Sequence, residues 1–401
     1  MTASTSIDPR IEYGTDIDLF SQASLMDPYA DYKALQDIGE IAYLRRYDMW
    51  AVTRYDGVKR VLGAPEIFKS GDGIGMNDTL NTAWAPFAPC LDGQDHAPLR
   101  RVMMQTIGPK AASQYTGTIE AAAGRLVDEV VEKGEFDAVT EFAQILPTRV
   151  ILDLIGLDPD PALRIDLLHW ATDSYNCCGP DGSFDDTLPS MQKLYGYVLE
   201  NMGEEGFRPG SIGAQTWEAA HKGMITPEQA FGILGGYATA GLDTTASAIG
   251  SLMMLFSQHP DQWELVRDDP SLIPSAVLEG VRVESPAQWF TRVTTADVDF
   301  GDVTVDAGTR MYHSYGAANR DPRKYPDPER FDVRRNPADS LAFGFGVHTC
   351  MGKSLSNLEI FSLMSELVRK VDRIEPTGEP VRHVNNLIRS LESQPVRVHP
   401  R

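Results

Sequence analysis

The sequence predicts a mainly α-helical protein with a minor β region, and three observations lead to this class. Helical periodicity runs almost without interruption from residue 98 to residue 259. The longest helical pattern, from Thr226 to His259, is apolar on most of its faces, which is typical of a helix buried on most sides. Short segments with strand-like alternation occur near the N-terminus and again after Ser285.

The first part of the chain mixes short strands and helices. Residues 41–55 predict two strands around a polar turn at 46–48. Asp56 is expected to cap the helix that follows, with Val58 and Leu62 on its apolar face. Residues 70–95 are rich in Gly, Asn, Pro and Asp and predict a long irregular loop. Loops of this length in compact proteins are usually functional or disordered.

The middle of the chain predicts amphipathic helices over residues 119–131, 142–154 and 163–175, the second with a break at Pro147. In the longest helix, Thr226 and Gln229 have the spacing of a capping box, and Pro260 ends the pattern. Strands are expected over 293–305 and 308–313, and a final helix over 351–371. We find no internal repeat and no low-complexity linker.

Composition indicates a soluble protein without a nucleic-acid or membrane partner. The chain carries 36 basic and 57 acidic residues, a net charge of −21, which suits neither nucleic acid nor an anionic membrane. No apolar run is long enough to span a bilayer, and the polar N-terminus has no signal-peptide pattern. We therefore expect a cytoplasmic location. Four cysteines in 401 residues are no disulfide framework, and no C-x-x-C pair is present.

The most informative segment is the loop around Cys350. Residues 343–352 read Phe-Gly-Phe-Gly-Val-His-Thr-Cys-Met-Gly. Its glycines allow backbone to approach a flat group closely. Cys350 stands just before an amphipathic helix, whose N-terminus favours a thiolate. The alternative is a glycine-rich turn that holds a buried structural cysteine.

The whole ten-residue pattern resembles the haem-binding loop of cytochromes P450, Phe-x-x-Gly-x-x-x-Cys-x-Gly. The resemblance implies haem b, iron protoporphyrin IX, with Cys350 as the axial thiolate and metal ligand. It also implies that Phe343 packs near the sulfur and that Gly352 belongs to the cofactor-binding loop. The fold implied is that of the cytochrome P450 family, a triangular prism of helices with a long central helix over the haem.

Two further motifs precede the cysteine loop in the order expected for that family. Glu279-Gly-Val-Arg282 resembles the family's Glu-x-x-Arg pair, whose members share one helical face. Pro328-Glu-Arg-Phe331 resembles the segment that supplies a third partner, here Arg330. The resemblance implies a structural brace behind the haem rather than a catalytic group.

Four side chains are expected to bind the haem propionates. His96-Ala-Pro-Leu-Arg100 resembles the helix that grips one propionate, and Arg292 and His348 match further positions. Arginine suits carboxylates best because its guanidinium group can bind both oxygens. Length alone favours two or three domains. Because the matches from residue 96 to residue 352 converge on one cofactor, a single domain over residues 1–401 is expected.

Within the longest helix, Ala240-Gly-Leu-Asp-Thr-Thr245 resembles the oxygen-binding stretch of the family. Thr244 can hydrogen-bond the carbonyl of Ala240, which bends a helix and opens room above the haem. The expected catalytic residues are Asp243, an acid that relays protons, and Thr244, a hydroxyl beside bound dioxygen. An acid buried in the middle of a helix is costly without such a purpose.

The expected substrate pocket is mainly apolar or aromatic, which suits a small aromatic or terpenoid substrate. Its lining is expected to include Ala85, Ala88, Tyr175, Thr239, Ala240, Leu242, Phe290 and Thr291.

Several segments resemble the bacterial branch that demethylates para-methoxybenzoates. In that branch the substrate carboxylate meets an Arg and a Ser before the first haem-gripping helix, and polar groups on the long helix. Here those positions fall on Ala85, Ala88, Gly235 and Gly236, and no Arg or Lys occurs between residues 70 and 98. We therefore expect a neutral methoxylated ring. The alternative is that Arg382 or Arg389 replaces the missing cation and the substrate is a methoxybenzoate. The matching segments are Ala240–Thr245, Glu284–Pro286, Ala318–Pro322 and Asn385–Ser393.

The expected activity is insertion of one oxygen atom of dioxygen into a small aromatic substrate, by O-demethylation or hydroxylation. The chain has no flavin or iron–sulfur segment, so NAD(P)H electrons are expected to arrive through a ferredoxin reductase and a ferredoxin. An acidic ferredoxin would dock on a basic face formed by Arg100, Arg101, Lys110 and Lys353. The alternatives are a peroxygenase driven by hydrogen peroxide and a non-catalytic haem sensor. The pair of Asp243 and Thr244 argues against both.

Overall fold

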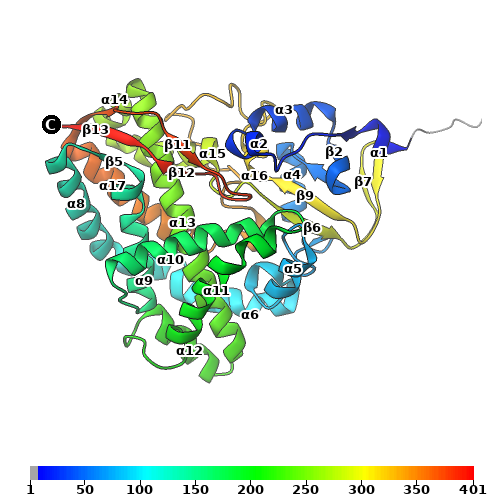
Figure 1. Cartoon of the computed structure of the whole chain (residues 1–401), viewed down its shortest axis with the longest axis horizontal. Coiled ribbons are helices and arrows are strands. Elements are labelled where there is room, and N and C mark those ends of the chain that lie inside the picture. Colours follow the sequence, from blue (N-terminus) through cyan, green and yellow to red (C-terminus); the bar gives the residue numbers. More distant parts are fainter. Residues whose placement is uncertain (1–7) are drawn as a thin grey trace, which may run out of the picture.

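The computed structural model describes residues 8–401 and has a roughly triangular outline (Figure 1). Helices fill its larger part, and a sheet with short helices forms the part that carries the N-terminus. Helix α13 (Pro227–Gln258) passes through the helical part, with most of its residues buried. Thr226 and Gln229 form the capping box at its start. The prediction of a mainly α-helical fold with a minor β region and a long central helix is confirmed.

The main sheet has six strands in the order β1-β2-β3-β9-β6-β4. Hairpin β2–β3 is antiparallel, and β3 joins β9 in parallel, so the N-terminal and C-terminal halves of the chain share one sheet. The strands of this sheet are β1 (Gly14–Thr15), β2 (Ile41–Leu44), β3 (Met49–Val52), β4 (Phe68–Lys69), β6 (Trp289–Thr294) and β9 (Arg310–Ser314). The helices of this part are α1 (Pro9–Glu12), α2 (Gln22–Met26), α3 (Tyr29–Ile38), α4 (Tyr55–Gly63), α5 (Asp78–Trp84) and α16 (Tyr315–Asn319).

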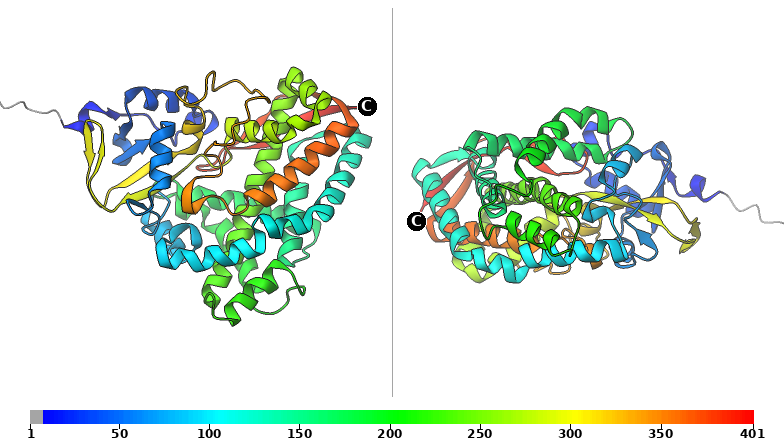
Figure 2. Two further views of the ribbon diagram at one scale, coloured as in Figure 1. Left: turned by 180° about the vertical axis from the view of Figure 1, so that it is seen from behind. Right: turned by 90° about the horizontal axis from the view of Figure 1, so that it is seen from below.

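The helical part packs around α13, and its rear is best seen in the left panel of Figure 2. There α17 and α8 lie side by side, and α6 crosses below them. The helices are α6 (Gly93–Ile107), α7 (Pro109–Ala112), α8 (Thr116–Lys133), α9 (Ile145–Ile155), α10 (Pro161–Ser174), α11 (Ser183–Asn201), α12 (Ile212–His221), α14 (Pro260–Asp268), α15 (Ile273–Glu284) and α17 (Lys353–Lys370).

Three small sheets complete the fold. Strands β10 (Val371–Pro376), β13 (Pro395–Pro400) and β5 (Glu135–Asp137) form one sheet, which holds the C-terminus against the helical part. Strands β11 (Val381–His383) and β12 (Ser390–Ser393) form a hairpin that packs near α13. Strands β7 (Val298–Phe300) and β8 (Val303–Val305) form the third sheet.

The structure corrects two local predictions in the first part of the chain, one about a helix cap and one about an expected loop. Helix α4 begins at Tyr55, so Asp56 lies inside its first turn and does not cap it. The cap is distant in sequence, because the N–H of Tyr55 donates to the carboxylate of Asp321 at 2.9 Å. The stretch 70–95 is not one irregular loop, since it contains α5, whose N-cap Asn77 accepts a hydrogen bond from the N–H of Leu80.

The expected break at Pro147 is instead a helix start. A π-helical turn, Val139–Ala143, precedes α9, which begins at Ile145. Pro147 therefore lies in the first turn, where a residue without an N–H leaves no helical hydrogen bond unmade.

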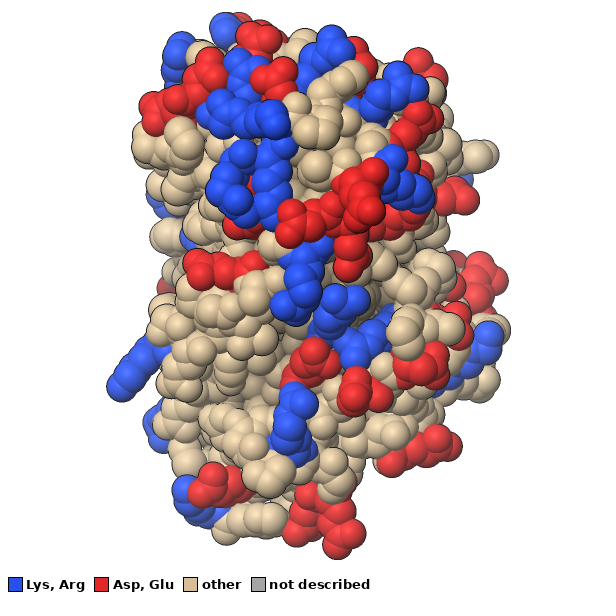
Figure 3. Space-filling view, turned by 90° about the vertical axis from the view of Figure 1, so that its left-hand side faces the viewer, with Lys and Arg blue, Asp and Glu red and all other residues tan. Residues whose placement is uncertain are grey.

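Charges on the face formed around α8, α14 and the C-terminal strands are mixed despite the acidic total. Figure 3 shows Lys and Arg side chains interspersed with Asp and Glu there. Ion pairs such as Lys370–Asp128 and Arg397–Glu135 account for this pattern. Over residues 8–401, every helix is too short or too polar to cross a membrane.

Candidate active site

The conformation of the cysteine loop depends on two glycines with left-handed backbone angles. Gly344 and Gly346 have positive φ angles of 69° and 75°, a conformation that favours glycine. A Cβ atom at Gly346 would lie 2.6 Å from the carbonyl oxygen of Leu62. The N–H of Cys350 donates to the carbonyl of Phe343 at 2.8 Å, which closes the loop. The sequence therefore needs these glycines to bring Cys350 to the start of α17.

Cys350 remains accessible although protein surrounds its thiol on most sides. Burial raises the pKa of this thiol, while the N–H groups of Gly352 and Lys353 and the charge of Arg100 act in the opposite direction. Phe343 lies beside it, with the ammonium group of Lys353 5.4 Å from its ring centre. The loop thus presents one sulfur with backbone donors aimed at it, the arrangement that suits a metal-bound thiolate.

The brace next to the loop is a buried ion-pair network. Arg282 donates to both carboxylate oxygens of Glu279, at 2.7 and 2.8 Å, and both residues are fully buried. The third partner is Arg335, whose Nε lies 2.9 Å from Glu279. The expectation that Arg330 fills this place is wrong: its side chain is exposed, and it contributes a backbone carbonyl. The turn after residue 328 carries Arg335, not Arg330, back to the helix.

The four residues expected at the propionates lie on elements that converge beside the loop. The rings of His96 and His348 are 4.4 Å apart, and the guanidinium group of Arg100 donates to the carbonyl of Thr349. Burial, together with the charges of His348 and Arg100, lowers the pKa of His96 to about 4. Arg292 is buried on β6 and donates to the carbonyl of Thr291.

Two polar residues of this cluster were missed by the sequence reasoning. The Nε2 atom of His348 lies 3.3 Å from Ser70 and 3.3 Å from Asp92. Burial alone would raise the pKa of Asp92, but hydrogen bonds from His348 and from the N–H of Gly71 lower it below its ordinary value. Asp92 belongs to no recognisable sequence motif, because its partner, His348, is distant in sequence.

The stretch of α13 from Ala240 to Thr245, which is expected to bind oxygen, has the predicted local hydrogen bond. The hydroxyl of Thr244 donates to the carbonyl of Ala240 at 3.0 Å. Ala240 and Gly236 are exposed in the middle of an otherwise buried helix, so this flank of α13 borders open space. Thr245 donates to Ser356 at 3.1 Å, which ties this stretch to the first turns of α17. The structure thus brings Thr244 and the cysteine loop to one region.

Asp243 points the other way and is buried. Its Oδ1 atom accepts a hydrogen bond from Ser247 at 3.0 Å, and Oδ2 has no partner. Burial raises the pKa of Asp243 above its ordinary value. A carboxyl held in this way keeps its proton at higher pH than an exposed one, as a proton donor requires.

The residues expected to line the substrate pocket differ in their burial. Tyr175, Thr239, Leu242 and Ala88 are buried, Phe290 is half-buried, and Ala85 is exposed at the end of α5. Thr291 does not fit, because its hydroxyl is bound to the carbonyl of Gly75 at 3.0 Å and to Arg310 at 3.1 Å. Because successive side chains of a strand point to opposite faces, the side chain of Thr291 lies on the other face of β6 from those of Phe290 and Arg292.

Aromatic residues missed by the sequence reasoning line the same region. Phe87 packs against α13, where a Cβ at Gly232 would lie 3.0 Å from its ring. The ring of Phe87 stacks on Tyr195 of α11, with 6.4 Å between ring centres. Trp84 is also buried, and its indole nitrogen has no partner. The small residues at 232, 235 and 236 on a buried helix were the available signal that large rings pack there.

The fold and the accessible thiol at the start of α17 suit a haem-thiolate protein, and comparisons with known proteins identify the family. A family model described as cytochrome P450 matches residues 218–395. Cytochrome p450 CYP199A2 of Rhodopseudomonas palustris is 33% identical over 96% of this chain and 94% of its own length. Beta-dihydromenaquinone-9 omega-hydroxylase of Mycobacterium tuberculosis is 30% identical over 96% of this chain and 79% of its own length.

Solved structures agree with these sequence matches. Cytochrome P450 CYP109Q5 from Chondromyces apiculatus superposes with a TM-score of 0.80 at 29% identity, over 97% of this chain and 99% of that one. Epothilone D-bound cytochrome P450epoK, at 22% identity, shares the fold with a TM-score of 0.85, over 96% of this chain and 100% of that one. The chain belongs to the cytochrome P450 family and is a monooxygenase of that family.

The family implies a haem with cysteine thiolate ligation, and the donor set fits that group. An accessible thiol with backbone donors stands at the start of α17. Cationic and hydrogen-bonding side chains, which suit two carboxylates, cluster beside it: His96, Arg100, Arg292 and His348.

Proposed function

We propose that this protein is a haem-thiolate monooxygenase that takes electrons from a ferredoxin and removes the methyl group of a small, neutral methoxy-aromatic compound. The observation that carries the proposal is the placement of Cys350 and Thr244 in one region, with the preceding residue, Asp243, buried in α13. A bound haem, held by Cys350 with its propionates at His96, Arg100, Arg292 and His348, would supply reductive activation of dioxygen.

In this proposal the protein's own residues donate the protons, and its apolar side chains exclude water. The hydroxyl of Thr244, bound to the carbonyl of Ala240, can also donate to an oxygen atom on the open flank of α13. Asp243 precedes Thr244 in the chain, and burial raises its pKa above the ordinary value. Phe87, Tyr175 and Leu242 form apolar walls that keep bulk water away from this step.

The acid and hydroxyl also favour this reaction over the two alternatives. A peroxygenase receives both oxygen atoms and protons with hydrogen peroxide and has no need for a buried acid behind a helical threonine. A haem sensor has no need for either group. Keeping a carboxyl with an unpaired oxygen in the middle of α13 costs stability, which is consistent with a catalytic use.

The charges near the pocket favour a neutral ring. Burial opposes ionisation of Glu284, but Arg389, Arg382 and Arg320 lower its pKa to about 2. Arg382 lies 2.8 Å and Arg389 3.2 Å from its carboxylate. Both arginines are therefore committed to Glu284, and neither is free to bind a substrate carboxylate. Arg310 is likewise bound to backbone carbonyls at residues 72 and 73.

Binding titrations test the substrate class. A buried ring gains about 25 cal/mol per Å² of apolar area, whereas an unpaired buried carboxylate costs several kcal/mol. Guaiacol should therefore shift the haem spin state at a concentration roughly tenfold lower than para-methoxybenzoate, and turnover of guaiacol should release formaldehyde. Tighter binding of the benzoate would contradict the neutral-ring proposal. A terpenoid that binds more tightly than both would contradict the aromatic class.

A further inference from the structure

Trp84 carries a buried hydrogen-bond donor that the protein itself does not use. Its side chain is 8% exposed, and its indole nitrogen is buried without a hydrogen-bond partner among residues 8–401. Two other buried tryptophans donate to backbone carbonyls, Trp289 at 2.7 Å and Trp263 at 2.9 Å. Leaving a buried N–H without an acceptor costs free energy. The unused donor of Trp84 therefore indicates an acceptor from outside the chain.

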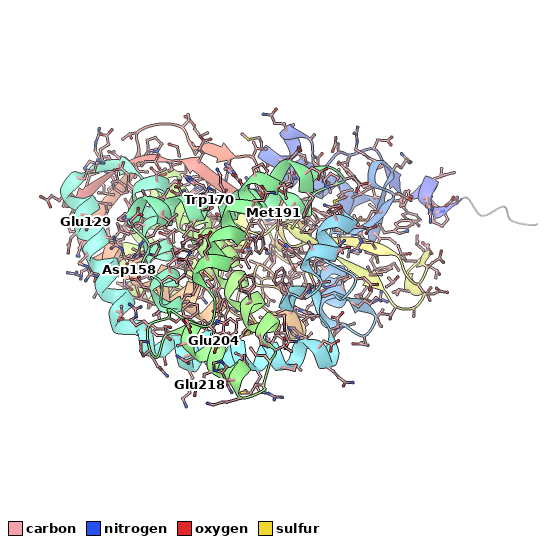
Figure 4. The ribbon with its side chains drawn as sticks, turned by 60° about the horizontal axis from the view of Figure 1, so that its bottom comes forward. Glu129, Asp158, Trp170, Met191, Glu204 and Glu218 are labelled. Atoms are coloured by element: carbon pink, nitrogen blue, oxygen red, sulfur yellow. The ribbon has the colours of Figure 1, made fainter. Side chains whose placement is uncertain are left out.

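Trp84 belongs to the apolar cluster that borders the expected substrate pocket. It packs in one cluster with Tyr175, and the partly buried rings of Phe87 and Phe290 pack against them. Met191 of α11, labelled in Figure 4, is a further member. The N–H of Phe87 donates to the carbonyl of Trp84 at 2.9 Å, so the turn after α5 carries both rings to this cluster. The unused N–H therefore lies among the rings of the pocket wall.

Tyr195 of α11 supplies a hydroxyl to the same cluster. Its ring packs against the cluster and stacks on Phe87, with 6.4 Å between ring centres. Burial raises the pKa of the Tyr195 phenol, and the N–H of Trp84 acts in the opposite direction. A hydroxyl group bound between the two residues would accept from Trp84 and donate to Tyr195, which leaves none of these polar groups unpaired.

Other polar side chains expected at the pocket are already bonded within the protein. The hydroxyl of Thr239 donates to the carbonyl of Gly235 at 2.9 Å, and that of Thr291 donates to the carbonyl of Gly75 at 3.0 Å. The N–H of Trp84 remains available, whereas these two hydroxyls do not. An indole N–H is uncharged and only donates, so it suits the lone pair of a neutral oxygen and brings no charge to compensate a carboxylate.

We propose that the N–H of Trp84 binds the hydroxyl group of a phenolic substrate and that Tyr195 accepts the hydrogen bond that this hydroxyl donates. The inference rests on the proposed function and narrows its substrate from neutral methoxy-aromatic rings to methoxyphenols. A site that pairs a hydroxyl group discriminates against an analogue without one, because the polar groups of the site then stay unpaired.

The test compares guaiacol with 2-methoxytoluene, a ligand of similar size in which a methyl group replaces the hydroxyl. Spin-state titration of the haem-loaded protein gives a dissociation constant for each. The ratio of the two constants reports the hydroxyl, because the loss of ring area in a variant weakens both ligands alike. In Trp84→Phe the preference for guaiacol should fall by about fivefold, as expected for the loss of one buried hydrogen bond. Tyr195→Phe should lower this preference by a smaller factor.

The matched control is Trp217→Phe. The indole of Trp217 donates to the carbonyl of Met202 at 3.2 Å, so its N–H is already used. Trp217 lies on α12 next to Glu218, which Figure 4 labels well away from Met191. This variant should keep the ligand ratio of the wild type.

A ratio in Trp84→Phe equal to that of the control would overturn the inference, because the N–H would then serve only the packing of the protein. If guaiacol binds with the expected preference but releases no formaldehyde on turnover, the proposed function is overturned and the role of Trp84 in binding stands. If neither ligand binds, both are overturned.

Discussion

Thr244 is the residue whose replacement should separate electron use from product formation. Its hydroxyl is bound to the carbonyl of Ala240 and lies on the open flank of α13. In Thr244→Ala, oxygen and NAD(P)H should still be consumed, because Cys350 and the pocket walls are unchanged. Severalfold more of the electrons should emerge as hydrogen peroxide, because the proton donor is missing.

Thr216→Ala is the control for this change. Thr216 is a buried threonine of α12 whose hydroxyl makes the same bond four residues back, to Ile212 at 2.7 Å. Its loss should cost stability and leave the peroxide yield per electron unchanged. Equal peroxide yields in the two variants would remove Thr244 from the mechanism.

Glu359 predicts a pH dependence of stability. This buried carboxyl of α17 has an oxygen without a partner, and burial raises its pKa from 4.5 to about 8. Between these two pH values the unfolded chain binds fewer protons than the native protein. The free energy of unfolding should therefore fall as pH rises through this window, by up to about 1.4 kcal/mol per pH unit.

Replacing Glu359 by glutamine should remove that slope. The free energy of unfolding of the variant, relative to that of the wild type, should increase steadily from pH 5 to pH 8. Above pH 8 this difference should stay constant. Denaturant unfolding of the haem-loaded proteins at several pH values measures this difference. Glu366→Gln, on the same helix but paired with Lys370 at 2.9 Å, should show no such gain. Parallel stability curves for Glu359→Gln and the wild type would contradict the raised pKa.

At the scale of elements, the brace behind the cysteine loop distinguishes two neighbouring arginines. Arg335 binds Glu279 at 2.9 Å, whereas the side chain of Arg330 is exposed. Arg335→Ala leaves one oxygen of a buried carboxylate short of a charged donor and should lower the free energy of unfolding by about 2 kcal/mol. Arg330→Ala should stay within about 0.5 kcal/mol of the wild type. The reverse order in thermal or denaturant unfolding would contradict this assignment.

The same element shows what can be predicted from sequence. Glu279 and Arg282 lie one turn apart on a helix, so their spacing alone predicts that they meet. The third partner depends on how the irregular segment 321–339 folds back, and no periodicity encodes that path. Asp321 capping α4 and Asp92 binding His348 are similar cases. Contacts made by single polar side chains across distant segments leave no local pattern.

Helices with a strong apolar face were predicted well, because burial imposes the 3.6-residue period. Their start points were predicted less well wherever the cap came from elsewhere, as at Tyr55. In the site, the residues that carry a motif, such as Cys350 and Thr244, could be named in advance. Pocket residues such as Phe87 could not, because packing of a ring against Gly232 depends on the tertiary fold.

At the scale of the whole molecule, local charge should govern electron delivery. The net charge is −21, yet Arg101 in the middle of α6 and Lys110 in α7 are both exposed. An acidic ferredoxin that docks there should transfer electrons more slowly as ionic strength rises. Arg101→Glu should slow transfer further at low salt, while Arg125→Glu on α8 serves as a control of equal charge change. A transfer rate insensitive to salt would contradict electrostatic docking.

The central claim is that Cys350 binds the haem iron, and the spectrum of the reduced, carbon-monoxide-bound protein tests it most directly. The wild type should show the red-shifted Soret band of thiolate ligation. Cys350→Ala should lose that band, and Cys178→Ala, which removes a buried cysteine far from the loop in sequence, should keep it. A histidine-type spectrum in the wild type, or a thiolate band that survives in Cys350→Ala, would contradict the account.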